Sequence, residues 1–312
     1  MKTKPNVVTR RAGAKDCAWI ATASLLRAAA LVSVLAPMSL LTSCGKAPAP
    51  AATEVVALER SALPSDPNDA AWADAPTFAA ALIVQDMVEP RLMNASTTQV
   101  RVQAITDGRQ IAFRLAWSDS TNNDLPGAAR FADACAVQLP VAQGPDLPAP
   151  QMGEAGRRVE ITYWSAFWQA AVNGRPDSIS ALYPDARVDH YPFEAAALAP
   201  GSEEQRAMEL RYAPARALGN PMARPLPGEA PVQDLIAEGP GTLTPAPVTR
   251  SRGAAKWAGG EWRVVLTRAL PWTISPSERS QVAFAVWDGA HQEAGARKMR
   301  SVWIPLSVQG PA

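Results

Sequence analysis

QVAFAVWDGAHQEAGARKMRSVWIPL, residues 281–306, predicts two strands joined by a polar loop. Its first arm, residues 282–287, is a short and almost continuous apolar run of β-forming residues, as is typical of a buried strand. Asp288-Gly289 ends this run, and the small polar loop 290–297 follows. We expect the rest of the fold to be built around this strand pair.

Lys298 is the residue of this stretch that needs an explanation. The second arm, residues 299–306, alternates and places Val302, Ile304 and Leu306 on one face. Counting in twos puts Lys298 on that same face, toward the expected core, provided that no bulge intervenes. A lysine is almost never fully buried unless something compensates its charge. Lys298 is therefore a candidate for a functional role.

Further strands are predicted at 98–106, 110–117, 134–139, 159–164 and 262–268. Asp107-Gly108 lies between the first two and is a strong hairpin signal, and residues 258–261 predict another hairpin. These strands are short and separated by turns, and long helical periodicity is absent. The pattern indicates an all-β fold, an antiparallel β-sandwich with few short helices and long irregular loops.

The segments between the strands predict little regular structure. Residues 65–72 form a turn cluster ending in an aromatic residue, so we expect an irregular opening segment. Residues 202–212 have a helical composition and predict a surface helix. Prolines recur every few residues over 213–248, where we expect ordered but irregular coil.

The N-terminus predicts an export signal. A basic region precedes an apolar stretch at 28–41 that is too short to span a bilayer comfortably. The sequence Leu41-Thr42-Ser43-Cys44 resembles a bacterial lipobox, in which Cys44 is lipidated and becomes the mature N-terminus. Thr9-Arg10-Arg11 loosely resembles a twin-arginine signal, so the export route stays open.

These signals divide the chain into three parts. Residues 1–43 are the lipoprotein signal, residues 44–53 are the lipidated cysteine with an Ala/Pro tether, and residues 54–312 are one β-sandwich domain. We expect a periplasmic protein held at a membrane by lipid. Gly45 stands where an aspartate would favour the inner membrane, which slightly favours the outer one.

Composition excludes several kinds of function. The chain has 30 Lys and Arg against 29 Asp and Glu, and its body has no basic block, so nucleic acid is not an expected partner. With Cys17 in the signal and Cys44 lipidated, Cys135 is left alone as a plain buried thiol. The sequence has no nucleotide loop, HExxH helix or GxSxG motif. Its carboxylates are scattered through polar loops, where we expect a solvated surface.

Several stretches together resemble the haem b, or gamma, subunits of the periplasmic molybdenum enzymes around ethylbenzene dehydrogenase. That group includes dimethylsulfide dehydrogenase, selenate reductase and chlorate reductase. The likeness occurs in the family's order at residues 100–119, 151–164, 189–194, 237–244, 259–270 and 284–303. It implies a β-sandwich that holds one non-covalent haem b between a methionine and a lysine.

By this resemblance the axial lysine falls on Lys298 and the methionine on Met152, which stands before a glycine in the family's manner. The alternatives stay open: Lys256 is the rival lysine, and His291, beside Lys298, is the rival ligand of another type. Other methionines are available at Met87, Met93, Met208, Met222 and Met299. His190 is expected to be a turn residue.

The resemblance implies electron transfer between an iron–sulfur subunit of a molybdenum oxidoreductase and a cytochrome or a quinol-linked carrier. A lysine binds iron only when neutral, and deprotonating a free lysine at pH 7 costs roughly 4 to 5 kcal/mol. Burial lowers that cost. Two protein ligands would leave the iron without an open site, which favours a relay over oxygen chemistry or peroxidase activity.

Two other functions remain open from the sequence. A carbohydrate-binding module could have a similar sandwich, with exposed tryptophans as its sugar platforms. Alternatively, a copy of the family could have lost its haem and serve as a structural or assembly subunit. Trp117, Trp164, Trp262, Trp287 and Trp303 are expected in the sandwich core, with some of them lining a haem pocket.

The lipobox interpretation makes a direct prediction. Replacing Cys44 by serine removes the sulfur that would carry the lipid. We expect the Cys44→Ser variant to lose both labelling by fatty acid and association with the membrane fraction. Unchanged labelling and membrane association in the variant would contradict the interpretation.

Overall fold

The computed structural model describes residues 52–125, 127, 129–142, 144, 146–176, 183–185, 198–218, 230–272 and 279–310. Cys44, His190, Met222 and the segment 189–194 lie outside these residues. Within the described part no helix is long and apolar enough to cross a membrane.

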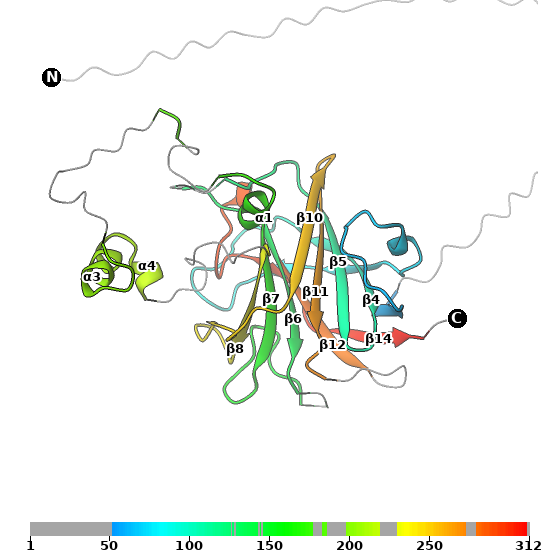
Figure 1. Cartoon of the computed structure of the whole chain (residues 1–312). Coiled ribbons are helices and arrows are strands. Elements are labelled where there is room, and N and C mark those ends of the chain that lie inside the picture. The colour runs from blue at the N-terminus through cyan, green and yellow to red at the C-terminus, as the bar shows by residue number, and fades with distance from the viewer. Residues whose placement is uncertain are drawn as a thin grey trace, which may run out of the picture. The chain divides into compact units, whose positions relative to one another are not determined.

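The described elements, shown in Figure 1, are mostly strands. Their bounds are β1 Val55–Glu59, η1 Ala70–Ala73, β2 Phe78–Ala81, β3 Ile83–Val84, β4 Gln99–Thr106, β5 Gln110–Ser118, β6 Ala134–Pro140, β7 Val159–Ser165, α1 Ala166–Val172, α3 Glu203–Tyr212, α4 Pro214–Ala217, β8 Val232–Ala237, β9 Thr244–Pro245, β10 Arg252–Ala258, β11 Glu261–Ala269, β12 Ser280–Trp287, η3 Gly289–His291, β13 Met299–Arg300 and β14 Ile304–Gln309. The predicted all-β class is confirmed.

The strands form two layers joined by β12. In the first layer the order is β10-β11-β5-β4-β1-β14, and in the second it is β12-β6-β7-β8-β9. The first three residues of β12 pair with β14, and its remaining residues pair with β6, so β12 belongs to both layers. One feature differs from the expected antiparallel sandwich: β1 lies parallel to both β4 and β14.

Most predicted strands and the surface helix are present. Asp107 closes the β4–β5 hairpin by accepting hydrogen bonds from the backbone nitrogens of Arg109 and Gln110, and Gly108 has a φ of 86°. Ser202 caps α3 by accepting from the nitrogen of Gln205. The expectation of coil throughout 213–248 is wrong, because β8 lies there and pairs with β7.

The predicted orientation of Lys298 is also wrong. Residues 301–303 interrupt the second arm between β13 and β14. The interruption shifts the alternation, so Met299 is fully buried with Ile304 and Leu306 in the core, while Val302 is 55% exposed. Lys298 therefore points away from the space between the layers.

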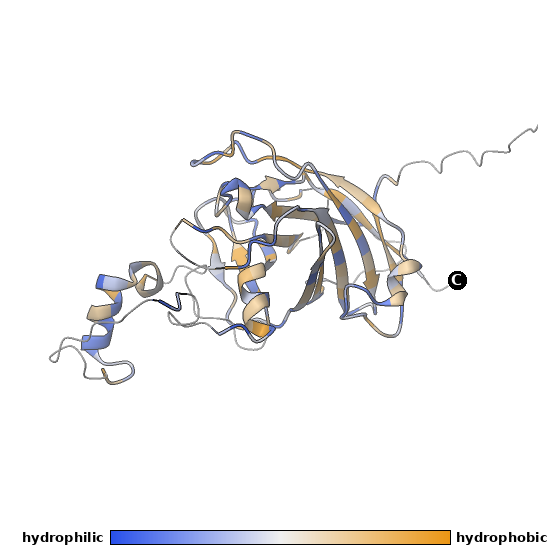
Figure 2. Ribbon diagram, turned by 90° about the horizontal axis from the view of Figure 1, so that it is seen from above, coloured by the Kyte–Doolittle hydropathy of each residue, from blue (hydrophilic) through white to orange (hydrophobic). Residues whose placement is uncertain are grey.

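Large apolar side chains from both layers fill the space between them. Trp117 of β5, Trp164 of β7 and Trp262 of β11 pack together, with ring centroids 5.0 to 6.4 Å apart. Phe113 of β5 meets Phe284 of β12 edge to face, with centroids 6.0 Å apart. Figure 2 shows apolar and polar residues alternating along the strands, as expected where one face of a strand is buried in this core.

The second layer also buries its outer face. A separate apolar cluster there contains Ala136, Ile161, Tyr163, Leu235 and Trp287. The short helix α1 adds Trp168, whose ring lies 5.4 Å from that of Tyr163. The strands of this layer are therefore covered on both faces, and the outer face carries the candidate site.

The Phe113–Phe284 contact predicts a specific loss of stability. Replacing Phe284 by alanine leaves a cavity between the layers, and we expect the free energy of unfolding to fall by about 3 to 5 kcal/mol. Urea unfolding followed by tryptophan fluorescence measures it. The control Val302→Ala changes an exposed side chain and should stay within about 0.5 kcal/mol. A large loss at Val302 instead would contradict the register described above.

Candidate functional site

Small side chains make the floor of a cavity on the outer face of the second layer. Ala285 of β12 and Ala136 of β6 lie directly opposite each other in the strand ladder. Ala283 extends this low surface along β12, and Trp287 bounds it. Larger residues at these positions would fill the space above the sheet, so the alanines leave room for a flat ligand.

Met152 reaches the cavity from the loop before β7. Its backbone adopts a positive φ of 70°, which is uncommon for any residue but glycine or asparagine, and Gly153 follows at 82°. A side chain at Gly153 would collide with the carbonyl oxygens of Arg157 and Ala237. Met152 and Gly153 therefore form a turn that has little freedom to move.

Hydrogen bonds fix this loop to the sheet. Gln138 Nε2 donates to the carbonyl oxygen of Pro150 at 3.1 Å, and Trp303 Nε1 donates to that of Pro148 at 2.7 Å. The nitrogen of Gly239 donates to the carbonyl oxygen of Met152 at 2.9 Å. The thioether is thus held in place by three separate parts of the chain.

Lys298 also reaches the cavity, from the end of the loop that follows β12. Gln85 holds this loop: its backbone nitrogen donates to the carbonyl oxygen of Lys298, and its Nε2 donates to that of Ala296. Trp287 Nε1 donates to the carbonyl oxygen of Gly295 at 3.1 Å. These bonds direct the lysine side chain over the floor of the cavity.

The two predicted ligands meet in the cavity. Lys298 Nζ lies 3.6 Å from Met152 Sδ, although 146 residues separate them in the sequence. The cavity has a volume of about 260 Å³, and most of its lining is apolar, including Ile161, Leu235 and Leu243. The structure thus brings together the lysine and the methionine that the sequence singled out.

The surroundings of Lys298 favour its neutral form. Burial, followed by the nearby charge of Arg300, lowers the pKa of Lys298 from its ordinary value of 10.5 to about 8. No carboxylate of the described residues lies within ion-pair distance of its Nζ. The ring of Trp287, 5.2 Å away, favours the charged form, but it does not offset the loss of water.

Arg300 is a second buried cation at the cavity. Its side chain is 6% exposed, its Nε has no hydrogen-bond partner, and its Nη1 makes one long contact of 3.5 Å to the carbonyl oxygen of Ser301. A buried guanidinium with so few acceptors is costly. An anionic group in the cavity would satisfy it.

The structure does not bring the rival ligands to the cavity. Lys256 pairs with Asp66 at 2.7 Å on the surface. The His291 side chain is 58% exposed, and its Nδ1 lies 2.8 Å from Asp288 Oδ2. Among the other described methionines, Met299 is in the sandwich core, and Met87, Met93 and Met208 are exposed.

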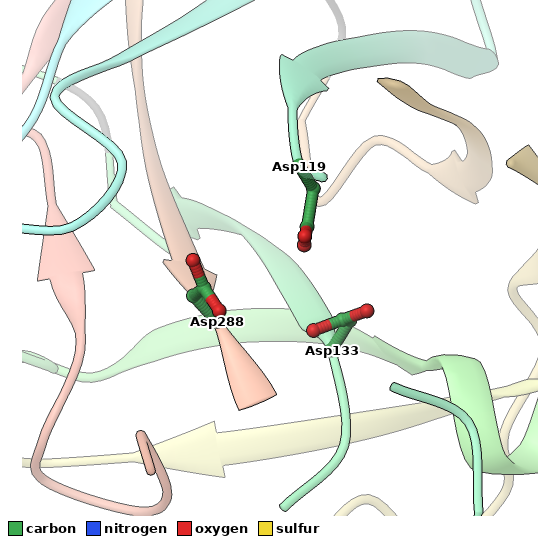
Figure 3. A group of neighbouring side chains, drawn as sticks. All are labelled: Asp119, Asp133 and Asp288. Atoms are coloured by element: carbon green, nitrogen blue, oxygen red, sulfur yellow. The ribbon is translucent and has the colours of Figure 1, made fainter. Parts of the chain in front are cut away.

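Some of the chemistry was not predicted from the sequence. The expectation that all carboxylates are solvated is wrong: Asp119, Asp133 and Asp288 are buried together (Figure 3). Burial raises the pKa of Asp133 to about 7 against several hydrogen bonds, and the charge of Asp119 adds to the shift. The paired alanines and Arg300 were also missed. In the sequence, the only sign of the alanines' role is that they occupy alternate positions in two apolar strands.

Comparison with known proteins places the chain in a family. A family model described as ethylbenzene dehydrogenase matches residues 69–299, a span that includes both Met152 and Lys298. A Haloferax mediterranei protein that carries the name of a respiratory nitrate reductase haem subunit is 23% identical over 259 residues, covering 80% of this chain and 71% of its own. The chlorate reductase gamma subunit of Ideonella dechloratans is 25% identical over 251 residues, covering 78% and 79%.

Solved structures show only a weak likeness. A family 9 carbohydrate binding module of Caldicellulosiruptor kristjanssonii in complex with cellotriose has a TM-score of 0.38 and 8% identity, and it aligns over 83% of this chain and 95% of its own. The same kind of module in complex with glucose has a TM-score of 0.35 and a sequence identity of 7%. Scores this low bear on neither the fold nor the function.

The environment of Lys298 predicts its titration. In protein without a ligand, we expect the Lys298 ammonium to titrate with a midpoint near pH 8, because burial and Arg300 disfavour its charge. NMR detection of lysine side chains, assigned by loss of the signal in Lys298→Met, measures this midpoint. Arg300→Met is the matched variant and should raise it, since one nearby positive charge is gone.

The same shift fixes the sign of a stability change. The cost of the charged lysine is fully present below pH 8 and disappears as pH rises toward 10.5. Lys298→Met should therefore be more stable than the parent by about 3 kcal/mol near pH 7, with the difference vanishing above pH 10.5. A midpoint above pH 10 would contradict both expectations.

Proposed function

The chain belongs to the ethylbenzene dehydrogenase family, and from this premise we propose that it is a haem b protein that passes electrons to or from an oxidoreductase. The observation that carries the proposal is the pair formed by Lys298 Nζ and Met152 Sδ across an apolar cavity. The haem subunit name of the Haloferax mediterranei relative supports it.

The residues of the cavity fit a haem. Lys298 Nζ and Met152 Sδ lie 3.6 Å apart, so both could contact one metal after a small movement of the side chains. The alanine floor suits a flat ring, and the unsatisfied guanidinium of Arg300 suits the carboxylates that a haem carries on its edge.

Lys298 and Met152 would hold the haem iron. Haem supplies one-electron oxidation and reduction when bound. Lys298 binds as a neutral amine, and its lowered pKa removes part of the cost of losing the proton. Met152 binds without losing a proton, and a thioether ligand tends to raise the reduction potential.

A relay function follows from this ligand set. Two protein ligands leave no position on the iron for oxygen or a substrate, so the protein transfers electrons and does not itself catalyse a reaction on a substrate. We infer non-covalent binding of haem b, since Cys135, the one cysteine among the described residues, is buried in the sandwich core.

A relay needs a donor and an acceptor. The chlorate reductase gamma subunit among the relatives supports a catalytic oxidoreductase as one neighbour. We propose that this neighbour is an iron–sulfur subunit of a molybdenum enzyme, and that the second partner is a cytochrome or a quinol-linked carrier. The setting is the periplasm, with the chain anchored through Cys44. Purification from the native membrane with metal analysis tests this, and recovery of the chain alone would contradict it.

The carbohydrate-binding alternative has lost its main support. Sugar-binding modules of that kind use exposed tryptophans as platforms. None of the tryptophans in the described ranges is exposed: Trp287 and Trp303 pack on the outer face of the second layer, and Trp72 and Trp168 are buried. Most of the cavity surface, moreover, is apolar.

Substitutions of the two ligands should have different effects. Lys298→Ala removes a strong-field nitrogen, and we expect the added haem to show a high-spin spectrum at neutral pH. Met152→Ala keeps the nitrogen, so haem remains bound while the reduction potential falls. Acidification should release the lysine in the parent and give a spectral transition that Lys298→Ala lacks. Visible absorption and redox titration of the purified variants measure these changes.

His291→Ala is the matched control, since His291 is the rival nitrogen ligand and lies outside the cavity. It should leave the low-spin spectrum almost unchanged. If His291→Ala abolishes that spectrum while Lys298→Ala preserves it, the ligand assignment fails and haem binding stands. A parent protein that stays colourless after haem is added overturns the function itself.

A further inference from the structure

Three buried aspartates lie together where strands of the two layers end (Figure 3). Asp119 follows β5, Asp133 precedes β6 and Asp288 follows β12. These residues are 5%, 0% and 7% exposed, and one carboxylate oxygen from each lies within 4.8 Å of the other two. Carboxylates are seldom buried this completely without a partner of opposite charge.

Hydrogen bonds satisfy part of this cluster. Asp133 Oδ1 accepts from the nitrogen of Gly289 at 2.8 Å, and its Oδ2 accepts from the nitrogen of Asn123 and from Trp262 Nε1. Asp288 Oδ1 accepts from the nitrogens of Ala290 and His291. These donors orient the two carboxylates and leave some of their lone pairs free.

Asp119 is different because one of its oxygens makes no hydrogen bond. Its Oδ1 accepts from the nitrogen and hydroxyl of Thr121. Its Oδ2 is buried and unpaired, and the nearby indole N–H of Trp117 is left unpaired as well. Figure 3 shows the Asp119 carboxylate directed into the space between Asp133 and Asp288. An unpartnered buried oxygen aimed at two other carboxylates calls for a cation there.

The protein supplies little positive charge at this place. In the described part of the chain, neither Asp119 nor Asp133 forms an ion pair. His291 contacts Asp288 alone, on its outer side, and its side chain is 58% exposed. Three carboxylates in a buried site therefore repel one another unless an ion or a proton enters.

We propose that Asp119, Asp133 and Asp288 bind one divalent cation, with Ca²⁺ as the best fit. The site offers only oxygen, which hard cations prefer. Two oxygens that are each about 2.4 Å from the same ion lie at most about 4.8 Å apart, and each pair of these carboxylates is within that limit, so an ion can reach all three after a small inward movement of the side chains. Mg²⁺ demands shorter bonds and near-ideal octahedral geometry, which three strand ends fixed by backbone hydrogen bonds do not provide.

Such an ion would join the two layers at this end of the sandwich. It would connect the end of β5 in one layer to β6 and β12 in the other. Gly289 brings these segments close, since a side chain there would overlap the carbonyl oxygen of Phe131. The same loop continues to Lys298, but binding of the cation does not depend on haem.

The test uses the full chain, stripped with EDTA and dialysed. We expect isothermal titration calorimetry with CaCl₂ to show one site per chain, and elemental analysis to find one Ca²⁺ retained. Saturating Ca²⁺ should raise the Tm by about 5 °C or more over the EDTA sample. Failure of Ca²⁺ to bind, or a Tm that is equal in EDTA and Ca²⁺, overturns the proposal.

Two variants locate the site. Asp119→Asn keeps the acceptor for Thr121 and removes the unpartnered oxygen, so we expect Ca²⁺ affinity to fall about 100-fold or more and the Tm increase to disappear. Asp146→Asn makes the same chemical change at an exposed position and should bind Ca²⁺ as the parent does. If Asp119→Asn does not fold, the Ca²⁺ dependence of the parent still decides.

Two outcomes would replace the cation by another explanation. Stabilisation of the EDTA-treated parent on acidification, without any Ca²⁺ binding, would show that a shared proton neutralises the cluster. Equal Ca²⁺ binding in parent and Asp119→Asn would place the ion elsewhere. The haem spectrum of Asp119→Asn separates the proposals, because it should match that of the parent even where Ca²⁺ binding is lost.

Discussion

The strand β12 is buried on both faces, and this constraint organises the molecule. Val282, Phe284 and Val286 point between the layers, while Ala283, Ala285 and Trp287 point to the outer face. The inward residues are large and fill the core. Two of the outward residues are the smallest that still have a side chain. One strand therefore provides both the packing that holds the sandwich together and the space that forms the cavity.

The cavity is maintained against a considerable cost. It holds a lysine without a counter-ion and an arginine with almost no acceptors, and neither arrangement stabilises the fold. Features that destabilise a protein and persist at one place indicate a function there. Arg300 contributes twice: its charge disfavours protonation of Lys298, and its unsatisfied nitrogens favour an anionic ligand. When Lys298 loses its proton, its amine and the soft sulfur of Met152 form a pair of donors that can bind a metal.

The sequence predicted the strands well where one face is core and alternation is strong, as in β4, β5 and β12. It failed where the signal is not local. The strand β8 lies among prolines, and only its pairing with β7 shows that it is a strand. The register at Lys298 failed because three residues, 301–303, leave the ladder and reverse the alternation. The parallel pairing of β1 with β4 and β14 likewise joins distant parts of the chain.

The candidate site likewise has residues that the sequence predicted and residues that it did not. Lys298 and Met152 were found through the family resemblance, but their separation of 3.6 Å could not follow from a spacing of 146 residues. The aspartates were missed because each, taken singly, stands in a polar loop next to a strand end. A loop residue at the end of a strand becomes buried only when loops from both layers cover it. The local amino-acid composition does not predict this burial.

The loop from Asp288 to Lys298 connects the two unusual regions of the protein. At its first residue it enters the acidic cluster, and at its last it delivers an amine to the cavity. Between them, hydrogen bonds tie it to neighbouring segments: Trp287 and Gln85 donate to the carbonyl oxygens of Gly295 and Ala296, and Glu293 accepts from the hydroxyl of Ser96. The position of Lys298 thus depends on anchoring at both ends of the loop. Neutralising the aspartates would fix one end of the loop, and a ligand on Lys298 would fix the other. The conformation of the loop would therefore depend on both sites, although the two sites make no direct contact.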